Sequence, residues 1–196
     1  HARTLDERGG FSEFNALAVD GSGNVYAAGW QTRDRTYSYG PGVDAAGSAG
    51  SRNAVVVSYD SDLNAQWATT TTEGDVSSEF YAIAVDNQGT IYAAGYKRGN
   101  DMLAFAEEVT VAGSFAGASY GDENVLLVAY NTNGAAKTAR TTEAGSGDTV
   151  FSGVAASSTD AIAVGRQRGT ITFAYGDDLE AAGSAPAWPN AVIVRY

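Results

Sequence analysis

The chain has 196 residues, and its 23 acidic and 12 basic side chains give a formal net charge of −11. That charge opposes binding to phosphate backbones, and no apolar run approaches the roughly 20 residues of a spanning helix, so we expect neither a nucleic-acid partner nor membrane insertion. The chain has no cysteine, which excludes disulfides and thiolate chemistry. His1 is the one histidine, so histidine-based catalysis and metal binding are excluded as well. We expect no cofactor.

The sequence repeats itself three times. The segment that begins at Phe14 returns 66 residues later at Phe80 and a further 71 residues later at Phe151. Such a period indicates an array of supersecondary units. We predict one domain over residues 1–196, with repeats at about 14–79, 80–150 and 151–196, and with residues 1–13 supplying an outer strand.

Each repeat opens with a short strand and a tight turn. In the first repeat these are an alternating strand at residues 16–19 and a polar turn at 20–24, whose Asp, Asn and Gly favour chain reversal. The second strand, at 25–29, has alanines and a terminal glycine where larger β-formers are usual. We therefore expect close approach of neighbouring backbones there.

The rest of the repeat adds a hairpin and two strands. We predict an inserted hairpin over residues 36–40 and 43–48, then a continuous apolar strand at 54–59 and an outer strand at 65–70. The apolar strand, in all three repeats, is predicted to be buried on both faces. Four strands joined by short turns are typical of a propeller blade, so the predicted fold is an all-β propeller of four-stranded blades, three repeats per chain.

A longer pattern within the repeat resembles a known family. It reads Ala-Val-Asp-x-x-Gly-Asn-Val-Tyr-x-x-Gly, then Ala-Ala-Gly-Ser, then Val-Val-Val-Ser-Tyr-Asp. This is similar to the bacterial β-propeller repeat family called SBBP, best over residues 14–67 and 80–143, while Ser157 replaces the turn Asp in the third repeat. The resemblance implies an exported bacterial protein, secreted, periplasmic or at the cell surface, and it brings no catalytic motif.

Three blades do not complete a ring, because single-ring propellers have about 4 to 8. One interpretation is a homodimer of six blades, in which residues 1–5 of each subunit add a strand to the last blade of the other. The other is that the chain is part of a longer propeller whose missing sequence completes the ring.

Half of the basic residues follow the second strand of a repeat. Equivalent positions lie on one face of a propeller, so they would form a basic ring able to attract an anionic ligand or an acidic partner. The alternative is a solvated rim. The residues are Arg33, Arg35, Lys97, Arg98, Arg166 and Arg168.

Aromatic residues lie beside this ring. Trp30 and Tyr96 begin the same segment, and Trp188 lies in the insertion of the third repeat. Flat side chains on loops can stack on sugars, although packing between blades would also explain Trp30 and Tyr96.

Carboxylates offer the only route to catalysis or metal binding. Two hairpins carry acid clusters that could form a glycosidase-like pair or could be solvated tips, and we assign no catalytic residue. They are Asp177, Asp178 and Glu180 in one hairpin and Glu107 and Glu108 in the other. Asp60, Asp62 and Asn64 alternate as in a calcium loop, but Ala65 stands where that loop needs glycine, so a plain turn is favoured and no metal site is predicted.

These observations favour a noncatalytic binding or scaffold module that recognises a glycan, an anionic ligand or a protein partner. The predicted ligand-binding face carries residues 30–35, 96–98 and 166–168. The alternatives are a carbohydrate-active hydrolase that uses the hairpin carboxylates and a purely structural spacer.

Overall fold

The computed structural model describes residues 2, 4, 10–115, 121–176, 178–185 and 188–196. The described residues form seventeen β-strands and no helix, which confirms the all-β prediction. No helix that could cross a membrane occurs among them.

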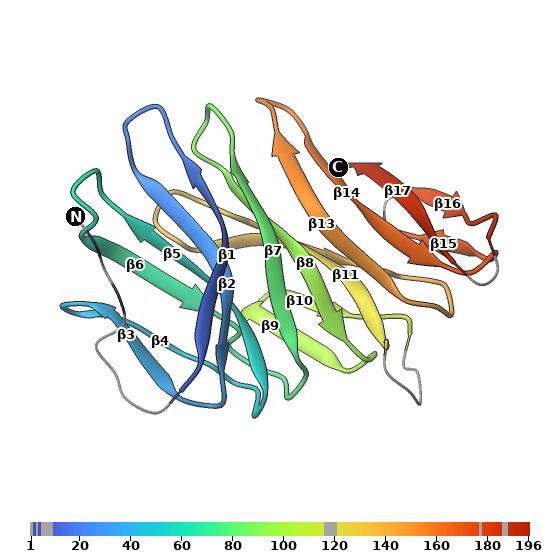
Figure 1. Cartoon of the computed structure of the whole chain (residues 1–196), viewed down its shortest axis with the longest axis horizontal. Coiled ribbons are helices and arrows are strands. Elements are labelled where there is room, and N and C mark those ends of the chain that lie inside the picture. Colours follow the sequence, from blue (N-terminus) through green and yellow to red (C-terminus); the bar gives the residue numbers. More distant parts are fainter. Residues whose placement is uncertain (1, 3, 5–9, 116–120, 177, 186–187) are drawn as a thin grey trace.

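Three antiparallel sheets stand in a row (Figure 1). The first has the strand order β1 (Ser12–Val19), β2 (Val25–Thr32), β5 (Arg52–Tyr59) and β6 (Ala65–Thr70). The second has the order β7 (Ser78–Val85), β8 (Ile91–Arg98), β11 (Glu123–Tyr130) and β12 (Ala136–Thr141). The third is β13 (Thr149–Ala156), β14 (Ala161–Arg168) and β17 (Pro189–Arg195).

A two-stranded hairpin follows the second strand of every sheet, as predicted for the insertion. The hairpins are β3 (Thr36–Gly40) with β4 (Val43–Ala46), β9 (Met102–Ala106) with β10 (Val109–Ala112), and β15 (Thr172–Ala174) with β16 (Glu180–Ala182).

An asparagine ties each hairpin to its sheet. In the first sheet, Asn53 Oδ1 accepts hydrogen bonds from the Ser48 and Ala49 amides at 2.9 and 2.7 Å, and its Nδ2 donates to the Arg33 carbonyl at 3.0 Å. Asn190 makes the same three bonds in the third sheet. Among the described residues of the second sheet, Asn124 accepts from the Phe115 amide alone and donates to the Gly99 carbonyl. The loops after β4, β10 and β16 are thereby fixed against the sheets.

The predicted close backbone approach is confirmed at the glycine of the second strand. A Cβ on Gly29 would lie 1.8 Å from the Glu13 carbonyl oxygen, and one on Gly95 would lie 1.9 Å from that of Glu79. A Cβ on Gly165 would likewise lie 1.9 Å from the Val150 carbonyl oxygen. The first strand of each sheet has a bulge next to this contact. The bulged backbone lies so close to the glycine of the second strand that no side chain fits there.

Two of the three core clusters lie between neighbouring sheets, at contacts that we call the first seam (first and second sheets) and the second seam (second and third sheets). The third lies between the first sheet and its hairpin β3–β4. The first seam packs Tyr26 and Val56 against Phe80 and Tyr130. The second packs Leu127 and its neighbours against a matching apolar set, which includes Phe151, Ala163 and Val194.

One expectation about the apolar strands is wrong. β5 and β11 are buried along almost their whole length, as predicted, but β17 alternates. Val192 and Val194 are buried against the second sheet, whereas Ile193 is 70% exposed on the other side. Among the described residues no further sheet covers that outer face.

The predicted outer strand of residues 1–13 remains largely untested, because residues 1, 3 and 5–9 lie outside the described residues. Its last residues, Ser12 and Glu13, belong to β1, which pairs with β2.

Candidate functional site

The residues of the predicted ligand-binding face lie at the ends of β2, β8 and β14. Tyr96 and Lys97 are only 3% and 0% exposed, so they lie inside the protein rather than on a binding face. The Lys97 ammonium group donates to the Gly99 carbonyl at 2.8 Å, which explains how a charged side chain is accommodated there.

Trp30 is covered by an ion pair that sequence reasoning missed. The Arg52 guanidinium lies 4.2 Å from the centre of a Trp30 ring and forms an ion pair with Glu79 across the first seam. Glu79 is 4% exposed and also accepts from Asn15 Nδ2 at 3.0 Å and from the Tyr96 hydroxyl at 3.3 Å. This cluster joins the first two sheets.

The other predicted cations are arginines, and two of them lie close to carboxylates. Arg166 Nη2 lies 3.0 Å from Glu123 Oε2, and Arg98 Nε lies 3.9 Å from Asp122 Oδ1, so carboxylates oppose both charges. Arg33, Arg35 and Arg168 are exposed, as is Arg166. Trp188, directly before β17, is 74% exposed. The predicted basic ring is therefore reduced by burial and by neighbouring acids.

The hairpin carboxylates do not converge on a cleft. Glu107, Glu108, Asp178 and Glu180 are exposed in two different hairpins, and Asp177 lies outside the described residues.

The 60–64 segment is a turn held by Asp60, whose Oδ1 accepts from the Asp62 and Asn64 amides at 2.9 and 2.8 Å. No cluster of three potential metal-binding side chains occurs in the described part of the chain.

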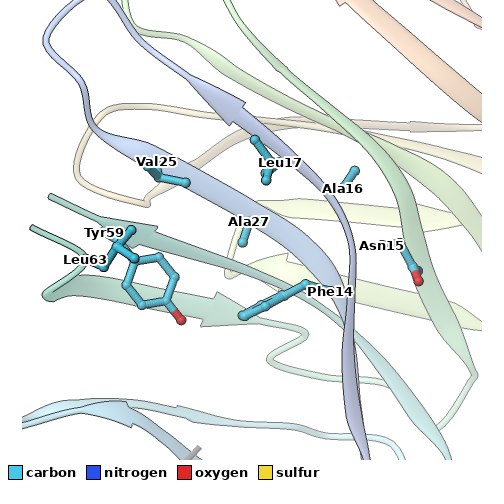
Figure 2. Close-up of a pocket in the computed structure, with 8 residues that line it drawn as sticks. All are labelled: Phe14, Asn15, Ala16, Leu17, Val25, Ala27, Tyr59 and Leu63. Carbon is cyan, nitrogen blue, oxygen red and sulfur yellow. The ribbon is translucent and has the colours of Figure 1, made fainter. Parts of the chain in front are cut away.

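A shallow apolar pocket opens on the outer face of the first sheet (Figure 2). It has a volume of about 390 Å³ and is lined by Phe14, Leu17, Tyr59, Leu63 and four smaller neighbours. The Phe14 and Tyr59 rings meet edge to face, with centroids 6.4 Å apart. The lining offers few polar groups, so it suits an apolar surface better than a soluble metabolite.

A larger, polar cleft lies in the first seam, at the end away from the Arg52–Glu79 pair. Two of the turns that line it, β1–β2 and β7–β8, project along the upper edge of Figure 1. Its volume is about 780 Å³. The turns β1–β2, β7–β8 and β11–β12 supply carboxylate, amide and hydroxyl groups, and Trp67 and Tyr26 supply aromatic surface. The polar side chains of its lining are Asp20, Ser22, Asn24, Ser58, Gln66, Asp86, Asn87, Gln88, Thr132 and Asn133.

Trp67 is fixed across the seam. Its indole nitrogen donates to the Thr132 carbonyl at 2.9 Å, and its ring centre lies 6.1 Å from that of Tyr26. A Cβ on Gly134 would lie 2.6 Å from the indole, so glycine at this turn lets the ring lie flat against the backbone. The half-buried indole is therefore a rigid part of the cleft wall.

Two aspartates shape the turns at the cleft. Asp20 accepts from the Ser22 and Asn24 amides and from the Tyr26 hydroxyl, at 2.8, 3.0 and 3.1 Å. Burial alone would raise the pKa of Asp20, but these hydrogen bonds outweigh it and hold that pKa below its usual value. Burial and the neighbouring Asp20 carboxylate raise the pKa of Tyr26 to about 12.

Asp86 repeats this turn with one difference. Its Oδ1 accepts from the Gln88 and Thr90 amides, both at 2.8 Å, and within the described ranges no protein donor binds its Oδ2. Asp86 therefore keeps an acceptor oxygen for a ligand.

The corresponding hollow at the second seam is different. It measures about 290 Å³, Thr138 stands in the position of Trp67, and Lys137 and Arg140 add positive charge. The first-seam cleft is thus the larger of the two and the one with an indole wall.

Comparison with known proteins adds no relative: no protein-family model matches the chain, and no curated protein matches it.

Proposed function

We propose that this chain is a noncatalytic glycan-binding module, and that its ligand occupies the polar cleft of the first seam. The observation that carries the proposal is the composition of that cleft: an indole fixed in its wall, surrounded by side-chain carboxylates, amides and hydroxyls. Sugars present both apolar C–H faces and hydroxyl groups, and such a lining matches both.

The charge of the cleft favours a neutral glycan over an anionic ligand. None of the described lining residues is Lys or Arg, whereas Asp20 and Asp86 are both present. An anionic ligand would meet these carboxylates with no cation to balance them. The glycan site therefore lies at the opposite strand ends from the predicted face of residues 30–35, 96–98 and 166–168.

We further propose that the three sheets are blades of a β-propeller in an exported bacterial protein of the SBBP type. Support comes from the common strand order of the first two sheets and from the hairpin inserted after the second strand of each. The SBBP-like sequence pattern supports the same assignment.

The binding proposal is tested with a panel of neutral oligosaccharides, such as cello-, xylo-, malto- and chito-oligosaccharides, by titration calorimetry on the full chain. We expect saturable binding of at least one member of the panel. Trp67→Thr introduces the residue that the second sheet has at this position, and it should weaken binding at least about tenfold, or about 1.4 kcal/mol.

Two further variants make the result specific. Gln88→Ala changes an exposed cleft residue and should weaken binding without a change in stability, whereas Trp188→Ala, a tryptophan outside the cleft, should leave binding unchanged. Absence of binding by every neutral oligosaccharide would refute the proposal and favour the spacer. Turnover of chromogenic glycosides would refute its noncatalytic part and favour the hydrolase.

A further inference from the structure

The two end sheets expose apolar positions that are buried at both internal seams. We call the side of each sheet that bears Phe14, Phe80 or Phe151 its phenylalanine face, and the other side its opposite face. In both seams, the opposite face of one sheet packs against the phenylalanine face of the next. Within the described residues, the phenylalanine face of the first sheet is therefore covered only in part, by its own hairpin β3–β4, and by no neighbouring sheet. The opposite face of the third sheet likewise has no neighbouring sheet in the described part of the chain, and we call both faces uncovered in this sense.

The phenylalanine face of the first sheet has the composition of a buried surface. Phe80 and Phe151 are both fully buried, whereas Phe14 is 44% exposed. Leu17 is 66% exposed, although its counterpart Ile83 is 8% exposed in the first seam. This face also forms the apolar pocket of Figure 2.

The opposite face of the third sheet shows the same contrast. Val164 is 41% exposed, while Ala94 at the same place in the second sheet is fully buried. Ile193 is 70% exposed, while its counterpart Leu127 is 4% exposed. Large apolar side chains gathered on an uncovered sheet face indicate an interaction surface.

We propose that the occupant of each surface is a second copy of this chain. The phenylalanine face of the first sheet in one copy packs against the opposite face of the third sheet in the other, so that two copies form two identical new seams. The internal seams support this pairing because they already join the same two kinds of face in the same order. Each copy has one uncovered face of each kind, so two copies cover all four and the contact closes on itself.

Charge at the new seam is also complementary. Arg195 is exposed on the same side of β17 as Ile193 and corresponds to Ser58 in the first sheet. Ser58 lines the polar cleft together with the Asp86 turn of the next sheet. In the proposed dimer, Arg195 would lie beside the corresponding turn of the second copy, which carries Asp20, so a cation would meet an acidic turn.

The inference is independent of the glycan proposal and is tested by the mass of the full chain in solution, using light scattering after size exclusion. We expect a particle of twice the 20.2 kDa chain mass. Leu17→Asp and Ile193→Lys each place a charge in both new seams and should each weaken dimerisation about 100-fold or more. Met102→Asp changes a 48% exposed apolar residue away from both faces and should leave the dimer intact.

Mixing the variants tests the head-to-tail order of the two copies. Leu17→Asp retains a native opposite face and Ile193→Lys retains a native phenylalanine face, so a mixture should recover dimers through one unaltered seam. Circular dichroism confirms that each variant is folded. A monomeric wild-type chain at micromolar concentration would overturn the proposal. So would a dimer that survives either charge substitution, or variants that remain monomeric when mixed.

Discussion

At the scale of single residues, one buried position distinguishes the second sheet from the other two. In the first and third sheets a buried glutamine accepts a hydrogen bond from a tyrosine of the hairpin, Gln31 from Tyr39 at 2.8 Å and Gln167 from Tyr175 at 2.7 Å. The second sheet has Lys97 in place of the glutamine and Phe105 in place of the tyrosine. The two changes occur together, because a lysine has no acceptor for a tyrosine hydroxyl.

Lys97 should make stability depend on pH. Burial lowers its pKa to about 8, against the opposing effect of Asp101 and Asp122. Because the unfolded lysine has the higher pKa, the unfolded state binds more protons between about pH 8 and 10.5, and stability gains from Lys97 as pH rises through that window. We expect Lys97→Met to be more stable than wild type by about 1–3 kcal/mol at pH 7, with the difference vanishing near pH 10.5.

Urea unfolding of both proteins at several pH values measures this difference. A stability difference that stays constant from pH 7 to 10.5 would show that the ammonium group is not desolvated. The double change Lys97→Gln with Phe105→Tyr restores the pair found in the other two sheets and should likewise remove the pH-dependent difference.

Glu79 is the second residue with a predictable energetic role. Glu79→Ala removes the acceptor for Asn15, Arg52 and Tyr96 at the first seam. We expect a loss of about 2 kcal/mol in the free energy of unfolding, because buried donors lose their partner. Arg166→Ala, which breaks the exposed pair with Glu123, is the matched control and should cost about 0–1 kcal/mol. Equal losses in the two variants would argue against a structural role for the Glu79 cluster.

At the scale of the elements, local sequence predicted the strands but not all their surroundings. The alternation in β1, the glycine within the second strand and the apolar run of β5 each act within a few residues, so these features were predictable. The length of the second strand was not, because it continues past the glycine to Thr32. The exposure of Ile193 was not, because its run resembles that of β5 and only the adjacent sheet decides which side is covered. Burial of Tyr96 likewise depends on another strand, because its ring packs against Tyr81 and its hydroxyl donates to Glu79.

The polar cleft was also beyond sequence reasoning. Trp67 is 65 residues from Thr132, and nothing in the local pattern indicates that the indole meets that carbonyl. The available signal was the tryptophan itself, since the corresponding strand of the second repeat has Thr138 there.

Gly95 tests the bulge that sets the spacing of the second sheet. Gly95→Ala would place a Cβ 1.9 Å from the Glu79 carbonyl oxygen, so β7 must move away from β8. We expect a loss of about 3 kcal/mol or more, because the clash is with backbone and cannot be relieved by a rotamer change. Gly21→Ala, at a turn with no atom within 4 Å of the added Cβ, should change stability by less than about 1 kcal/mol. Thermal unfolding compares the two, and a tolerated Gly95→Ala would contradict the close approach.

At the scale of the whole molecule, the position of a sheet in the row determines what it exposes. The middle sheet is covered on both faces, and its Phe80 and Leu127 are 0% and 4% exposed. The outer sheets use corresponding residues and leave Phe14 and Ile193 at 44% and 70%. One set of side chains therefore serves the internal seams and, in our proposal, the contact between two copies.

The contact between two copies is tested most directly by native mass spectrometry of the unmodified chain over a dilution series. We expect a species of two chains, twice 20.2 kDa, that dissociates only on strong dilution. A single-chain species at every concentration would contradict the proposed contact.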